Sequence, residues 1–126
     1  MISILWVGLG GALGASSRFL VSEWSVAVLG RGFPYGTLMV NVLGSLAMGV
    51  FLAAMSQELI APVPWRQLIA IGLLGAFTTF STFSVDTLML FQHGETVKAL
   101  LNVGLNLALC LGAAAMGAWL LGRITG

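Results

Sequence analysis

The chain has 126 residues, of which 59% are hydrophobic and only 7% are charged, and its formal net charge is +1 at pH 7. This composition excludes a water-soluble globule, because so few polar side chains could not cover the surface of one. The mean hydropathy of +1.05 is typical of an integral membrane protein.

The charged side chains leave four long windows of the sequence without any charge. Each window approaches the ~20 residues that a helix needs to cross the hydrocarbon core. We therefore expect one all-α membrane domain over residues 1–126, with transmembrane helices at about 2–21, 35–56, 66–91 and 97–121. The first window lacks the basic start of a signal peptide, which favours a true span over the alternative of a signal anchor.

The first span carries glycines at a spacing that suits close helix packing. Gly10 and Gly14, and likewise Gly11 and Ala15, lie four residues apart and would let neighbouring backbones approach. Arg18 lies near the predicted end of this span. We expect it to act either as an interfacial anchor or as part of a vestibule that attracts anions.

The second span begins after Pro34, a residue that suits a helix entry. Thr37, Asn41 and Gly44 or Ser45 follow one another at three- and four-residue steps and predict a narrow small and polar stripe. A carboxamide at this depth is costly unless it is bonded. Asn41 should therefore either bond another helix or donate to an ion in a pore, and the sequence leaves both open.

The third span contains the segment "GAFTTFSTFS" at residues 75–84. Gly75 and the pair Thr78 and Thr79 weaken a helix here, which predicts a break near the membrane midplane. Non-helical backbone at that depth must be buried or line a cavity, and its carbonyls become available as ligands. Beyond the break, Phe80 and Phe83 lie three residues apart among the hydroxyls of Ser81, Thr82 and Ser84.

The fourth span carries Asn102, Asn106 and Cys110 at four-residue spacing. This spacing predicts one polar stripe that faces protein or water rather than lipid. Nothing in the sequence indicates an enzyme, since His93 falls in a polar turn and no residues have metal-ligand or acid–base spacing. Nucleotide and nucleic-acid binding are likewise unsupported.

Basic residues are nearly balanced between the two sides of such a four-span chain. The termini and the loop at 57–66 would share one side, with Arg66 and Arg123. The loops at 22–35 and 92–98 would share the other, with Arg31, Lys98 and, if it reaches that interface, Arg18. Because basic bias normally fixes orientation, this balance predicts insertion both ways up and an antiparallel homodimer. Four short helices enclose little space, which also favours a pathway between subunits.

Three stretches, "GALGASSRF" (11–19), "PYGTLMVNVLGS" (34–45) and "GAFTTFSTFS" (75–84), resemble the Fluc (CrcB) family of fluoride channels. The resemblance covers the whole chain. It implies a fluoride-selective channel in the inner membrane of a prokaryote, surrounded by membrane lipid, which lets cytoplasmic fluoride leave passively. It also implies an antiparallel dimer with two pores along its interface and a structural sodium ion at its centre.

Individual positions take their expected roles from this resemblance. Asn41, Phe80 and Phe83 should line the pores, accompanied by a polar track at Ser81 and Thr82. The backbone carbonyls of Gly75 and Thr78 should hold the sodium ion. We predict that two residues of the polar stripes, Thr37 and Asn106, also line the pores.

Physical chemistry supports neutral donors in such a pore. Fluoride is small and tightly hydrated, and a buried cationic side chain would hold it too long for rapid passage. Amides, hydroxyls and the positive edges of aromatic rings avoid that trap. The alternative function is a small dual-topology, proton-coupled multidrug exporter, which needs a titratable carboxylate within the membrane. Asp86 is the one candidate for that role.

Overall fold

The structure, a computed structural model, describes residues 2–125. Every regular element in that range is a helix, which confirms the all-α prediction. The elements in chain order are α1 (Ile2–Leu29), α2 (Tyr35–Ser56), η1 (Arg66–Leu74), α3 (Gly75–Phe77), α4 (Phe80–Gln92) and α5 (Thr96–Thr125). The segment η1 is a π-helix that runs directly into α3.

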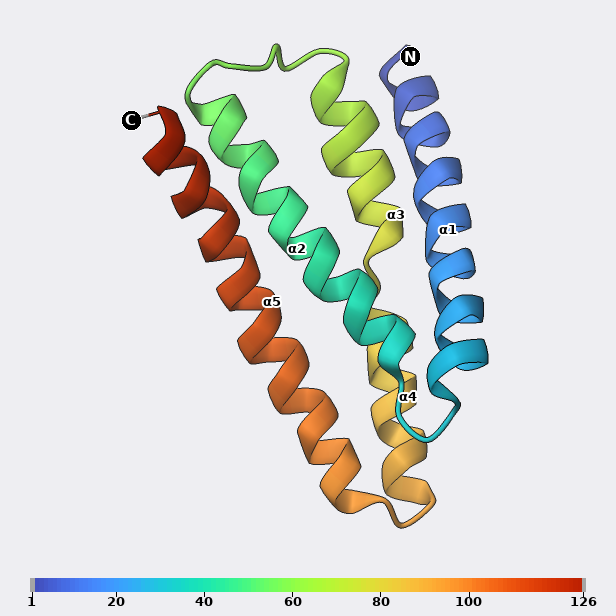
Figure 1. The fold of residues 1–126 in the computed structure, drawn as a ribbon. Coiled ribbons are helices and arrows are strands. Elements are labelled where there is room, and N and C mark those ends of the chain that lie inside the picture. Colours follow the sequence, from blue (N-terminus) through green and yellow to red (C-terminus); the bar gives the residue numbers. More distant parts are fainter. Residues whose placement is uncertain (1, 126) are drawn as a thin grey trace.

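The helices form four spans that run up and down the long axis of the molecule (Figure 1). All four are long and apolar enough to cross a membrane, the third being the composite Arg66–Gln92. Both ends of the chain lie at the same end of the molecule as the connection between α2 and η1. The α1–α2 and α4–α5 connections lie at the opposite end, as the sequence predicted.

The first helix is longer than the span predicted for it. We expected that span to end at about Val21, but α1 continues to Leu29 and stops at Gly30, whose φ is +81°. The N–H of Gly30 donates to the carbonyl of Val26 at 3.0 Å, and a glycine with positive φ often ends a helix in this way. Arg18 ends the first uncharged window, but a charged side chain near a membrane surface does not end a helix.

The predicted break in the third span is confirmed. Helical geometry ends at Phe77, and both Thr78 (φ −84°, ψ 157°) and Thr79 (φ −152°, ψ 118°) are extended before α4 begins. The Thr79 hydroxyl accepts a hydrogen bond from the N–H of Thr82 at 3.2 Å and so caps α4. Gly75 itself remains helical, so the break follows the threonines rather than the glycine.

The first half of the third span packs closely against α1. Gly10 and Gly14 are buried, and a Cβ on Gly14 would overlap the backbone oxygen of Leu73. Gly11 faces open space within the described chain. The glycine spacing therefore predicted a close helix contact, and the structure assigns that contact to the pair Gly10 and Gly14.

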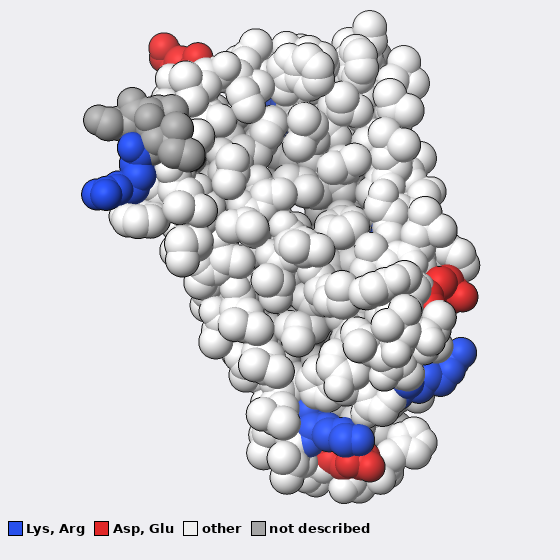
Figure 2. All heavy atoms as spheres, in the orientation of Figure 1, with Lys and Arg blue, Asp and Glu red and all other residues white. Residues whose placement is uncertain are grey.

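Charged side chains gather at the two ends of the face shown in Figure 2, and the broad middle of that face carries almost none. Large apolar side chains are widely exposed on the described part of the chain, including Leu13, Leu101 and Leu111. An apolar belt between two charged ends is the surface that a bilayer requires. The chain is therefore a multi-pass membrane protein.

Candidate functional site

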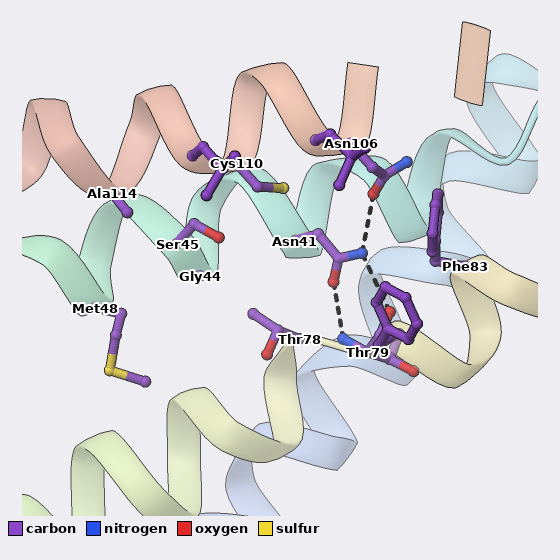
Figure 3. A pocket seen from close by; sticks show the side chains of 13 residues that line it. Asn41, Gly44, Ser45, Met48, Thr78, Thr79, Phe83, Asn106, Cys110 and Ala114 are labelled. Carbon is purple, nitrogen blue, oxygen red and sulfur yellow. Dashed lines mark hydrogen bonds between the residues drawn. The ribbon is translucent and has the colours of Figure 1, made fainter. Parts of the chain in front are cut away.

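A groove lies where α2 and α5 meet the break in the third span (Figure 3). Its volume is about 350 Å³, and most of its lining is apolar. The polar groups converge at one end, where Asn41 reaches across to the break. The lining residues are Asn41, Gly44, Ser45, Met48, Thr78, Thr79, Phe80, Phe83, Asn106, Leu107, Cys110, Leu111 and Ala114.

Asn41 links three helical segments through its carboxamide. Its Oδ1 accepts the N–H of Thr79 at 2.8 Å, and its Nδ2 donates to the Thr79 carbonyl at 3.1 Å and to Oδ1 of Asn106 at 3.0 Å. A carboxamide has two N–H donors, and both are used here. The structure thus shows the interhelical bonds that the sequence allowed, while donation to an ion remains a prediction.

Asn106 continues this network into α5. Its Nδ2 donates to the backbone oxygen of Asn102 at 2.8 Å and to Oδ1 of Asn102 at 3.0 Å. Asn102 in turn donates to the hydroxyl of Thr87 on α4 at 2.9 Å. Asn106 and Asn102 are both buried, so the polar stripe of the fourth span faces protein.

Phe80 and Phe83 differ sharply in their exposure. Their ring centroids lie 5.2 Å apart with an interplanar angle of 50°. Phe83 is buried at 7% exposure, whereas Phe80 is 74% exposed on the described chain. An aromatic ring this exposed beside an apolar groove is available to lipid, to a second copy of the chain or to an ion.

Hydroxyl groups surround the start of α4. The Thr79 hydroxyl donates to that of Thr82 at 3.1 Å and lies 3.3 Å from that of Ser81. Ser81 is exposed and Thr82 is half-buried. The helix also begins here, and its positive end lies beside the groove.

Thr37 does not line this groove. Its hydroxyl donates to Oδ2 of Asp86 at 2.8 Å, and both residues line a second cavity of about 620 Å³ that opens between the α1–α2 and α4–α5 connections. Thr82 lines this second cavity as well. The sequence placed Thr37 and Asn41 on one stripe, and the structure separates them between two cavities.

Two backbone carbonyls at the end of the first half-helix accept hydrogen bonds from side chains. Arg18 donates from Nε to the carbonyl of Ala76 at 3.0 Å, and its roles as an interfacial anchor or as part of a vestibule stay predictions. The carbonyl of Leu74 accepts the N–H and the hydroxyl of Thr78. Gly44 lets α2 approach the break, because a Cβ there would overlap the Thr78 side chain.

Sequence reasoning did not find the roles of Asn102, Thr87 and Thr79. The four-residue spacing of Asn102 and Asn106 was visible, but their partners lie on other helices. Thr87 carries no sequence signal beyond its hydroxyl, and Thr79 could be recognised only as a possible helix cap.

Comparison with known proteins places the chain in a family. The family model described as "CrcB-like protein, Camphor Resistance (CrcB)" matches residues 5–118. The chain belongs to the CrcB family. A protein of Vibrio vulnificus (strain YJ016) named "Fluoride-specific ion channel FluC" is 58% identical over 116 residues, which cover 92% of each chain.

Two further relatives of the CrcB chain carry the same printed name. The protein of Photobacterium profundum is 57% identical over 112 residues, covering 89% of this chain and 88% of the relative. The protein of Vibrio parahaemolyticus is 55% identical over 118 residues, covering 94% and 93%. With bacterial relatives and four membrane-spanning helices, the chain is a multi-pass protein of the inner membrane.

Proposed function

We propose that this CrcB chain is a fluoride-selective channel that lets cytoplasmic fluoride leave the cell passively. Relatives named as fluoride channels cover nearly the whole chain at 55–58% identity. Within the structure, the observation that carries the proposal is Phe80, which is 74% exposed beside a groove at the start of α4. A negative-inside membrane potential drives an anion outward, so such a pore needs no further energy source.

The groups around the break suit a small anion. The ring edges of Phe80 and Phe83 are positive, and the hydroxyls of Ser81 and Thr82 can donate hydrogen bonds. The N-terminal end of α4 adds a positive partial charge at the same place. Asn41 and Asn106 complete the polar end of the groove, although Asn41 must exchange a protein partner for the ion in order to donate.

We infer that two copies of the chain assemble antiparallel and complete the pores between them. The groove is open on one protomer, and Phe80 projects from its edge, so a second copy would enclose both. Nearly balanced basic residues at the two ends favour insertion in both orientations. Labelling of single cysteines in the 57–66 loop, in a Cys110→Ser background, should occur from both sides of the membrane. Labelling from one side only would contradict the antiparallel arrangement.

The carbonyl groups at the break fit a structural sodium ion. The residues described contain no cluster of three His, Cys, Asp or Glu side chains that could hold a metal, so a cation here would need backbone oxygens. The carbonyls of Gly75 and Thr78 lie where the helix ends and where an intrahelical partner is lost. Two copies would supply four such oxygens. Replacing sodium by a large organic cation should lower dimer stability or flux, and indifference in both would contradict the site.

The decisive experiment measures ion efflux from liposomes that contain the purified protein. A fluoride-selective electrode should record rapid efflux, and a chloride electrode should record almost none. Phe80→Ile keeps apolar bulk but removes the polarised ring edge, so it should lower fluoride efflux strongly. Phe80→Met should be milder, because its thioether is flexible and polarisable. Equal flux per folded dimer in the wild type and both variants would remove Phe80 from the mechanism.

A further inference from the structure

The three asparagines of the chain all belong to one series of hydrogen bonds. The N–H of Thr79 donates to Asn41, which donates to Asn106, which donates to Asn102. Asn102 donates to the Thr87 hydroxyl, and that hydroxyl donates to the Phe83 carbonyl at 2.8 Å. The series therefore joins α2, α5 and α4.

The direction of the series is fixed by its two ends. Its first member is a backbone N–H, which can only donate, and its last is a backbone carbonyl, which can only accept. Asn41 must turn its Oδ1 toward the Thr79 N–H, so its Nδ2 faces Asn106. Asn106 and Asn102 are oriented in the same way, each with its Oδ1 toward the donor before it and its Nδ2 toward the acceptor after it. Turning over any one of these carboxamides would set donor against donor and acceptor against acceptor.

Both ends of the series lie at the start of α4, one on its cap and one in its first turn. Thr79 is the cap of that helix, and Phe83 lies one turn further on. The residues between them are Phe80, Ser81 and Thr82, which carry the groups proposed to meet the ion. The hydrogen bonds therefore hold this turn against α2 and α5 from its start and from its end.

We propose that Asn102 is a positioning residue for the pore, an inference that rests on the proposed function. Asn102 has 0% exposure and cannot touch an ion in this structure. It acts through its neighbours, accepting from Asn106 on one side and donating to Thr87 on the other. Through them it sets the orientation of the Asn41 carboxamide and anchors the Phe83 backbone.

The first test removes the link between Asn102 and α4. Thr87→Val keeps the shape of the side chain but loses the hydroxyl, and we expect fluoride efflux per folded dimer to fall about tenfold, which corresponds to one hydrogen bond of about 1.4 kcal/mol. Thr87→Ser, which restores the hydroxyl, should recover most of the flux. Ser84→Ala is the matched control, because Ser84 also donates to the carbonyl four residues earlier on α4 but lies outside the series.

Combining variants separates positioning from a general loss of stability. Asn102→Leu should lower flux at least as much as Thr87→Val, because it removes the acceptor of Asn106 as well as the donor to Thr87. The double variant should lower flux no further than Asn102→Leu alone, because both changes break the same connection to α4. Additive losses, or normal flux per dimer in Thr87→Val, would overturn the inference. The fluoride efflux of the wild type tests the proposed function separately, and a conducting wild type beside unaffected variants would reject the positioning role alone.

A second measurement needs no variant and so does not depend on folding of a mutant. Selective ¹⁵N labelling of asparagine gives signals from only three side-chain amides, since the chain has only three asparagines. All three should show protected N–H protons in the wild-type protein, because each donates within the buried series. Exchange of all three at the rate of exposed amides would overturn the inference.

Discussion

The two halves of the broken third span are held in place by opposite means. The first half, η1 and α3, packs on α1 at two glycines. Gly10 and Gly14 have no side chain, so the two backbones come into direct contact there. The second half, α4 with its cap Thr79, is held to α2 and α5 by hydrogen bonds from polar side chains, namely Asn41 to Thr79, Thr37 to Asp86 and Asn102 to Thr87. Its N-terminal turn carries the residues proposed to meet the ion, so polar anchoring coincides with the functional half.

This difference has a physical basis in the membrane. Apolar burial gives little drive for helix association in lipid, so helices associate through close packing and hydrogen bonds. Close packing tolerates no added volume but needs no particular chemistry. A hydrogen-bond network tolerates small changes of volume but requires each donor and acceptor to match. The two halves should therefore respond to different substitutions.

The largest expected effect comes from adding volume to the first half. Gly14→Val would force its side chain into the backbone of Leu73 and should destabilise the protein by about 3 kcal/mol or more. Gly8→Val is the matched control on the same helix, since a Cβ there meets nothing within 4 Å. The stability of both variants is measured by unfolding in detergent, with size-exclusion chromatography to follow the folded protein. Equal stability of the two variants would show that α1 and the first half do not pack as closely as described.

Changing a polar side chain on α2 that anchors the second half should have a smaller effect on stability and a large effect on flux. Asn41→Asp keeps the shape but replaces the Nδ2 donor by an acceptor that faces the Thr79 carbonyl and Asn106. The mismatch should cost about 2 kcal/mol and abolish fluoride efflux. Ser45→Ala alters the same groove outside the network and serves as the control for stability. Normal fluoride efflux in Asn41→Asp would show that the Asn41 carboxamide has no role in conduction.

The smallest effect is expected at the junction between the halves. Arg18→Met removes the bond to the Ala76 carbonyl and the positive charge near the end of the first half-helix, which should cost about 1 kcal/mol. Arg31→Met is the control, because Arg31 is an exposed residue of the α1–α2 connection. The stabilities of the two variants and the wild type are compared through their midpoints of unfolding by denaturant. If both matched the wild type, the Arg18 contact would contribute nothing to the break.

Much of the fold could be predicted because it depends on local properties of the chain. The uncharged windows predicted four spans, and the second was placed at 35–56, where α2 runs from Tyr35 to Ser56. The Thr78 and Thr79 pair predicted the break, since threonine hydroxyls compete for backbone hydrogen bonds. The end of α1 was missed, because a charge marks the end of an apolar window and not the end of a helix.

The partners of the polar residues could not be predicted in the same way. The sequence showed that Asn41, Asn102 and Asn106 are costly to bury without partners. It could not show that Asn41 bonds Thr79 and Asn106, which lie 38 and 65 residues away. Nor could it show that Thr37 turns toward Asp86 and away from Asn41.

Residue type and order along the chain were enough to predict the apolar spans, the weak point in the third span and the groups that need hydrogen-bond partners. Those properties follow from residue type and spacing along the chain. Which groups meet depends on the packed arrangement, because hydrogen bonds between helices require a particular rotation of each helix and a particular distance between them. Glycines at the close contacts set those positions, and the fixed polarity of the Thr79 N–H and the Phe83 carbonyl then oriented every carboxamide between them.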